Sequence, residues 1–171
     1  QRQMCIRDRI MVDKEKDIVE VARELATTYH KGATDKYGNP YIDHLERVAN
    51  RVRDMEYDLV DETSHIGMYI AAAYLHDIIE DTNFGFDTVV LAYRDIFPIA
   101  VMEAVELLSR EPGTTYADYV TKIKLAPDVG GKIARVVKLA DLFDHLMGPT
   151  PCPPNLIKRY EKSLYSLYGR K

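Results

Sequence analysis

Four ionisable residues stand close together near the middle of the chain, where Ala-Ala-Tyr-Leu is followed by His76, Asp77, two isoleucines, Glu80 and Asp81. The surrounding apolar residues predict a helix over residues 66–80, and a charge inside such a helix is costly unless it is paired or binds a metal ion. The His-Asp pair offers one nitrogen and one oxygen ligand. Within one helix, Glu80 shares a face with His76, and Asp81 with Asp77. The two later carboxylates would then bind and deprotonate a water beside the metal. An ordinary polar helix end is the alternative.

Two further residues, His44 and Asp141, stand alone in other predicted helices. Each has an ordinary explanation, because a histidine near a helix start is more often structural and Asp141 can pair with a neighbouring lysine. Together with His76 and Asp77, they supply two nitrogens and two carboxylates. Such a mixed set suits manganese, iron, cobalt or zinc and leaves positions open for water and substrate.

Helical periodicity runs through the rest of the chain, without strand alternation or an internal repeat. The predicted helices cover residues 13–30, 66–80, 86–96, 98–108, 116–125, 132–147 and 156–168, with a further helix that begins near Tyr41. Thr63 or Ser64 is expected to cap the helix over 66–80. Loops are predicted at 32–40, at 127–131, and at 149–154, where four prolines exclude a helix. We therefore predict an all-α, single-domain bundle of about seven or eight helices.

Composition restricts the class of protein. The 171 residues are 46% hydrophobic and 29% charged, which is typical of a globular domain. A net charge of −4 argues against broad nucleic-acid binding, and no stretch is apolar enough to span a membrane. Cys5 and Cys152 form no paired motif, which favours a reducing compartment and a cytoplasmic location. Residues 1–10 are expected to be a non-native or disordered leader, and residues 11–171 the domain.

Three motifs carry a resemblance to a known family. They are Gly38-Asn-Pro-Tyr-Ile-Asp-His44, Leu75-His-Asp-Ile-Ile-Glu-Asp-Thr82 and Val137-Lys-Leu-Ala-Asp141. An early His, a central His-Asp and a late Asp on helices resemble the HD superfamily of metal-dependent phosphohydrolases. The three motifs in this order resemble the hydrolase domain of the RelA/SpoT family, and the size is similar to its stand-alone small alarmone hydrolase form. The resemblance covers about residues 21–160, and the family's synthetase domain has no room in this chain.

The resemblance implies a role for each matching residue. The implied ligands of a divalent metal ion, usually Mn²⁺ in this family, are His44, His76, Asp77 and Asp141. Glu80 and Asp81 would position and deprotonate the attacking water. Lys36 occupies the place of a basic residue that contacts the nucleotide. Lys138 lies three residues before Asp141 and is expected either to reach a phosphate or to neutralise that carboxylate.

The chain departs from the family pattern at the substrate. The family loop typically carries a Gln and one or more Arg, whereas this chain has Ala33-Thr34-Asp35. Four residues after the late Asp, the family typically has an Asn that contacts the nucleotide, whereas this chain has His145. His145 is expected to face the same cavity as Asp141, as a substitute nucleotide contact or as a phosphate donor when protonated.

The predicted activity is that of a guanosine-3′,5′-bis(diphosphate) 3′-pyrophosphohydrolase-like enzyme, with a small phosphorylated nucleotide as its partner. Neither nucleic acid nor a membrane is expected as a partner, and the sequence is compatible with an oligomer. One alternative is an HD-type nucleotidase or another nucleotide pyrophosphohydrolase. A second alternative is a non-catalytic module that senses a nucleotide. The pair Glu80 and Asp81 favours an enzyme, because binding alone does not need a base.

Overall fold

Seven helices make up most of the part of the chain that the structure describes, which in this computed structural model is residues 17–35, 37–55, 65–80 and 93–169. The helices are α2 (Ile18–Tyr29), α3 (Tyr41–Asp54), α5 (Ile66–Leu75), α7 (Ile99–Leu108), α8 (Tyr116–Leu125), α9 (Val129–Met147) and α10 (Pro154–Tyr168). Among the described residues, extended pairing is limited to one isolated bridge between Thr34 and Pro40. The prediction of an all-α helical bundle is confirmed.

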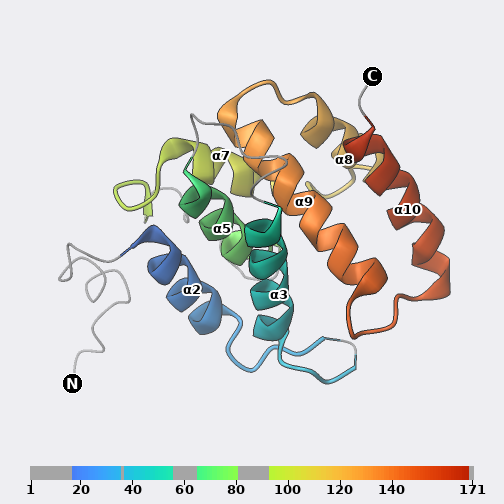
Figure 1. The fold of residues 1–171 in the computed structure, drawn as a ribbon, viewed down its shortest axis with the longest axis horizontal. Coiled ribbons are helices and arrows are strands. Elements are labelled where there is room, and N and C mark those ends of the chain that lie inside the picture. Colours follow the sequence, from blue (N-terminus) through green and yellow to red (C-terminus); the bar gives the residue numbers. More distant parts are fainter. Residues whose placement is uncertain (1–16, 36, 56–64, 81–92, 170–171) are drawn as a thin grey trace.

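Helix α5 lies in the centre of the bundle. It is apolar on every side, and its residues from Tyr69 to Leu75 are all buried. A helix with this composition must be covered all round, and α5 packs against α2, α3, α7 and α9. Figure 1 shows α3 and α5 side by side, with α2 on one flank and α9 on the other, while α10 forms the outer edge beyond α9. The polar segment that follows α5 is therefore brought between α3 and α9.

Helix α9 begins earlier than the sequence predicts. Val129, Gly130 and Gly131 were assigned to a break, but they form its first turn, where the Asp128 side chain accepts a hydrogen bond from the Gly131 amide. The two glycines are needed for close packing rather than for a turn. A Cβ atom on Gly130 would lie 2.7 Å from Glu103 Cβ, and one on Gly131 would lie 2.5 Å from Ala126 Cβ. An aspartate cap and a tight helix contact thus explain the difference.

Two other helix boundaries differ from the prediction. The proline-rich stretch was expected to exclude a helix, but helix α10 begins at Pro154. Proline is tolerated there because the first turn of a helix does not need its backbone N–H. Helix α5 ends at Leu75, not at residue 80, and the following residues form turns in which the Ile78 amide donates to the Leu75 carbonyl at 3.0 Å. His76 caps the C-terminal end of α5 and still has helical backbone angles.

Several predictions fall outside the described residues. These are the leader over 1–10, the cap at Thr63 or Ser64, and most of the helix predicted over 86–96. At the end of that last segment, the amides of Ile96 and Phe97 donate to the Tyr93 carbonyl in a turn. None of the helices in the described ranges has both the length and the apolar character needed to cross a membrane.

Candidate functional site

The four residues expected to bind a metal come together at the junction of α3, α9 and the turn after α5. His44 Nε2 lies 3.4 Å from Asp141 Oδ1 and 3.9 Å from Asp77 Oδ2. His76 Nε2 lies 3.0 Å from Asp77 Oδ2 and 3.9 Å from Asp141 Oδ1. Helix packing thus brings together two imidazoles and two carboxylates that are widely separated in the sequence.

The cluster contains buried polar atoms that make no hydrogen bond. His44 Nε2, His76 Nε2 and Asp141 Oδ1 have no hydrogen-bond partner in the described part of the chain. Most buried polar atoms in folded proteins do have one, because an unsatisfied buried group is costly. Three such atoms within a few ångströms of each other suit a common cation. His44, His76 and Asp77 each offer a ligand atom, and these atoms lie within 4.8 Å of one another. The residues present therefore fit a metal ion.

The tautomers of both histidines follow from the atoms that face their other ring nitrogens. His76 Nδ1 lies 2.7 Å from the Ala73 carbonyl oxygen, which can only accept, so Nδ1 carries the proton. His44 Nδ1 lies 2.9 Å from Asp144 Oδ2, again an acceptor. In the neutral form of each ring, the Nε2 lone pair is then directed toward Asp77 and Asp141. This arrangement is typical of metal-binding histidines.

Asp144 is a residue of the site that the sequence analysis missed. Its buried carboxylate accepts from His44 and from Arg47, whose Nε lies 2.9 Å from Oδ1. Burial raises the pKa of a carboxyl, but the hydrogen bonds from His44 and Arg47 outweigh it and lower the Asp144 pKa to about 2. The available signal was spacing, because Asp144 is three residues after Asp141 and Arg47 is three after His44.

The charges of the cluster favour a cation. Burial lowers the pKa of His44, but the neighbouring carboxylates of Asp141, Asp144 and Asp77 outweigh it and raise the pKa to about 10. The pKa of Asp141 is well below its ordinary value, because Lys138 and His145 outweigh the effect of burial. The same carboxylates that attract a proton to His44 attract a divalent ion, and binding of the ion displaces that proton.

Lys138 neutralises part of this charge. Its Nζ lies 2.7 Å from Asp141 Oδ2 and 5.2 Å from the centre of the Tyr119 ring. Burial opposes protonation of the amine, but Asp141 outweighs it and the Lys138 pKa is raised well above its usual value. Lys138 was expected either to contact a phosphate or to neutralise Asp141, and within the described residues it forms the ion pair with Asp141.

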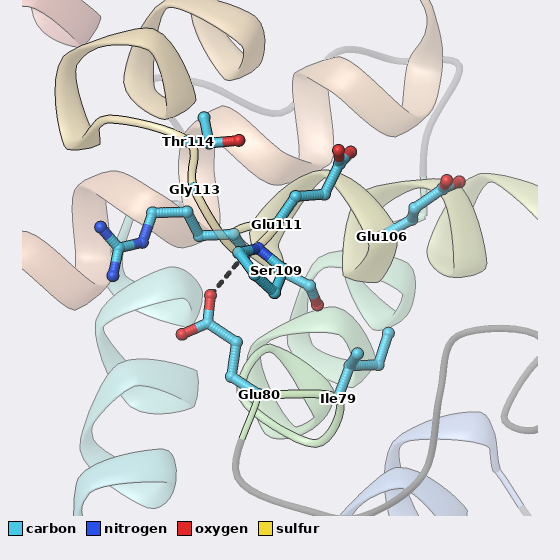
Figure 2. Close-up of a pocket in the computed structure, with 9 residues that line it drawn as sticks. Ile79, Glu80, Glu106, Ser109, Glu111, Gly113 and Thr114 are labelled. Atoms are coloured by element: carbon cyan, nitrogen blue, oxygen red, sulfur yellow. Dashed lines mark hydrogen bonds between the residues drawn. The ribbon is translucent and has the colours of Figure 1, made fainter.

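Glu80 occupies a different position from the one expected. Because α5 ends at Leu75, Glu80 and His76 do not share a helix face. The Glu80 carboxylate instead accepts a hydrogen bond from the Arg110 amide at 2.5 Å. Figure 2 shows this bond beside a cavity of about 550 Å³. Glu80 also lines the smaller cavity that contains Asp77 and Asp141. Asp81 and Lys36 lie outside the described residues.

The smaller cavity has a volume of about 230 Å³ and is lined by Asp77 and Asp141 of the four-residue cluster. Its wall also includes cationic and aromatic side chains from segments distant in the sequence, namely Arg110, Tyr116, Lys138, His145, Arg159 and Tyr160. The Arg159 guanidinium lies 4.5 Å from the centre of the Tyr116 ring and 5.4 Å from that of Tyr160. A cavity with acidic residues on one side and cations on the other can hold a metal ion and an anionic group together.

His145 faces the same cavity as Asp141, as the sequence predicts. Its Nε2 lies 3.1 Å from Asp141 Oδ1. The ring is stacked on His44, with 5.1 Å between ring centres, and on Tyr160, with 5.2 Å. Tyr160 lines the same cavity. Tyr41, which the sequence analysis did not select, donates to Asp77 Oδ2 at 2.5 Å.

Comparison with known proteins agrees with this geometry. No family model matches the chain. The "Probable GTP pyrophosphokinase" of Mycobacterium leprae is 27% identical over 142 residues, which are 80% of this chain and 16% of that protein. The "GTP pyrophosphokinase" of Streptomyces coelicolor is 27% identical over 129 residues, which are 75% of this chain and 14% of that protein. The chain thus spans about one sixth of the length of these relatives.

A solved structure gives the fold. It belongs to a metazoan ortholog of SpoT, described as hydrolysing ppGpp, and it superposes with a TM-score of 0.61 at 20% sequence identity. The match covers 90% of this chain and 87% of that chain. The resemblance to the RelA/SpoT family is therefore confirmed. The chain has the fold of the SpoT ortholog over nearly its whole length.

Proposed function

We propose that the chain is a metal-dependent phosphohydrolase of alarmone nucleotides, which removes pyrophosphate from the 3′ position of guanosine-3′,5′-bis(diphosphate). The observation that carries the proposal is the convergence of the unpartnered buried atoms of His44, His76 and Asp141 beside Asp77. The resemblance and the fold of a SpoT ortholog support the same activity. His44, His76, Asp77 and Asp141 would hold the ion, which we propose to be Mn²⁺. A bound divalent ion activates water and polarises a phosphoryl oxygen.

The residues of the chain supply proton transfer and substrate binding. Glu80 lines the cavity of Asp77 and Asp141, and it is the described carboxylate placed to take a proton from the attacking water. Asp81 is proposed to assist it. The hydrogen bond from the Arg110 amide fixes the position of the Glu80 side chain. The reaction consumes one water, breaks the bond between the 3′ oxygen and phosphorus, and releases pyrophosphate and guanosine diphosphate.

Arg110, Lys138 and Arg159 are proposed to bind the phosphates. The loop over 32–40 lacks the arginines typical of the family, whereas these three cations line the cavity from other parts of the fold. Arginine presents several N–H donors that match phosphate oxygens. The stacking of Arg159 on Tyr116 holds its guanidinium at the cavity wall. Lys36 is proposed as a further nucleotide contact.

The test is a nucleotide screen with product identification. Metal-free protein is reloaded with Mn²⁺ and incubated with guanosine-3′,5′-bis(diphosphate), its adenine counterpart, and simple nucleoside mono-, di- and triphosphates. Release of pyrophosphate from the 3′ position is the expected result, and Asp77→Ala should abolish it. Release of inorganic phosphate from monophosphates alone would support the nucleotidase instead. Metal binding and nucleotide binding without any product would support the sensing module.

A further inference from the structure

His145 lies against the metal-binding cluster although it is not one of the four ligands that the resemblance implies. Its Nε2 is 3.1 Å from Asp141 Oδ1. His44, Asp141 and His145 form a second group whose ligand atoms all lie within 4.8 Å of one another. Asp141 Oδ1 makes no hydrogen bond within the described residues, and His145 Nε2 is a potential ligand atom close beside it.

The two groups of ligand atoms share His44, and this restricts how many ions they can bind. His44 Nδ1 faces Asp144, which leaves only the single Nε2 lone pair for a metal. One lone pair binds one ion. The group of His44, His76 and Asp77 and the group of His44, Asp141 and His145 therefore cannot bind two separate ions through His44.

The distances agree with ligands of one ion. With bonds of about 2.0–2.2 Å to nitrogen and oxygen, neighbouring ligand atoms lie roughly 3.0–3.5 Å apart. Three separations fall in this range: 3.1 Å between His145 Nε2 and Asp141 Oδ1, 3.4 Å between His44 Nε2 and Asp141 Oδ1, and 3.0 Å between His76 Nε2 and Asp77 Oδ2. His44 Nε2 and Asp77 Oδ2, and His76 Nε2 and Asp141 Oδ1, are 3.9 Å apart, which is wider than the spacing of adjacent ligands. The contact of His145 with Asp141 is thus one of those with the spacing of adjacent ligands.

The orientation of the His145 ring is fixed by its neighbours. It is stacked on His44 with an interplanar angle of 27° and on Tyr160 with one of 25°. A ring held on both faces keeps its Nε2 directed at Asp141, whereas a mobile exposed histidine would not. This is notable because 43% of the His145 side chain is exposed, so burial alone does not hold it.

We propose that His145 is a fifth protein ligand, so that one ion is bound by three imidazoles and two carboxylates. The proposal rests on the proposed metal-dependent function and names a ligand that the family pattern lacks. Compared with the same site without His145, a third imidazole raises the affinity for cobalt, iron and zinc more than the affinity for manganese, which favours oxygen ligands.

The test compares variants of His145 by metal binding rather than by activity. His145→Phe keeps a ring between His44 and Tyr160 but removes the nitrogen, and His145→Asn restores the residue typical of the family. His65→Asn is the matched control, because His65 is an exposed histidine before α5 whose side chain makes no capping hydrogen bond. Circular dichroism and thermal unfolding establish that each variant is folded.

Metal-free protein is titrated with Co²⁺, Zn²⁺ and Mn²⁺ by calorimetry, and the visible spectrum of the Co²⁺ form is recorded. The parent and His65→Asn should bind one ion per chain with the same spectrum. Both His145 variants should lose at least about tenfold in affinity for Co²⁺ and Zn²⁺, a loss at least as large as that seen for residues around metal ligands. They should lose less for Mn²⁺, and their Co²⁺ spectrum should change.

Unchanged Co²⁺ affinity and spectrum in both variants would overturn the inference, and a raised KM with unchanged metal binding would assign His145 to the substrate instead. Two ions per chain in the parent would overturn the single centre. Parent protein that binds no divalent ion would reject the proposed metal-dependent function as well. If the parent binds one ion and the His145 variants bind it equally well, the proposed function stands and only the fifth ligand is rejected.

Discussion

Asp144 Oδ2 lies 2.9 Å from Nδ1 of His44, on the side of the ring opposite the metal-binding cluster. The same carboxylate accepts from Arg47, and Arg51 Nε lies 3.5 Å from it. The hydrogen bond between His44 and Asp144 therefore fixes both the tautomer and the orientation of the His44 ring. An anionic acceptor on Nδ1 also makes Nε2 a stronger ligand, so Asp144 would position His44 for the proposed ion without being a ligand itself.

Asp144→Asn is expected to weaken metal binding by about 10- to 100-fold, the range typical of residues that support a metal ligand. The amide oxygen can still accept from His44, but it lacks the negative charge that strengthens the ligand. Calorimetric titration of metal-free protein measures the change. Asp95→Asn is the control, because 62% of the Asp95 side chain is exposed. Equal affinities for parent and Asp144→Asn would show that the contact is only structural.

His76→Ala and Asp141→Ala should each remove bound metal, because each takes one ligand from a small set. His76 is buried and has a single unpartnered ring nitrogen facing the cluster. Asp141→Ala also leaves the buried Lys138 without its carboxylate, so loss of stability is expected in that variant but not to the same degree in His76→Ala. Elemental analysis of the folded proteins measures occupancy. A variant with full occupancy would exclude its residue as a ligand.

Glu80→Gln should keep the fold and the metal but lose most turnover. A positioned acid or base typically contributes about 10²- to 10⁴-fold. The amide oxygen of Gln can still accept from the Arg110 amide, so the change removes the base and not the contact. Glu106→Gln is a matched control, because Glu106 is an exposed glutamate of the neighbouring cavity (Figure 2). Near-normal turnover would transfer the role of the base to Asp81.

Helical periodicity predicted the all-α bundle, whereas the residue types and the family resemblance of the three motifs predicted that His44, His76, Asp77 and Asp141 meet. The end of α5 at Leu75 was not predictable in the same way. No glycine or proline marks it, and His76 and the following residues keep a helical pattern. The turn after Leu75 is instead set by tertiary contacts, among them the bond between Glu80 and the Arg110 amide.

Residues that reach the cavity only through the packing of distant segments could also not be predicted from the sequence. Arg110 follows α7 in a loop and Arg159 lies in α10, and only the packing of α7, α8, α9 and α10 brings both of them to the cavity. Asp144 and Arg47 did carry a signal, since each lies three residues after a proposed ligand. Neither of them was selected, because an Asp and an Arg on helices are most often solvent-exposed.

The loop over 32–40 should respond to acid at an unusually low pH. Hydrogen bonds from the side chain and amide of Asn39 and the amide of Tyr37 outweigh the burial of Asp35 and lower its pKa to about 2. A depressed pKa means that these contacts are fully present above about pH 4 and are lost as the pH falls toward 2. The amide signals of Tyr37 and Asn39, followed by NMR, should titrate with a midpoint near 2. A midpoint at the ordinary value of 3.8 would contradict the contacts.

Arg159→Met is expected to raise KM for a nucleotide bearing a 3′ pyrophosphate, with a smaller effect on kcat. A hydrogen bond to a charged group contributes about 1.5–3 kcal/mol, which corresponds to a rise in KM of roughly tenfold or more. Met keeps apolar contact with Tyr116 and Tyr160 but removes the charge, so loss of packing is not the cause. Arg94→Met is the control, because 62% of the Arg94 side chain is exposed. The size of the effect should increase with the number of phosphates on the substrate. The same loss for a monophosphate and a 3′ pyrophosphate would place Arg159 on the base or the sugar instead of on the phosphates.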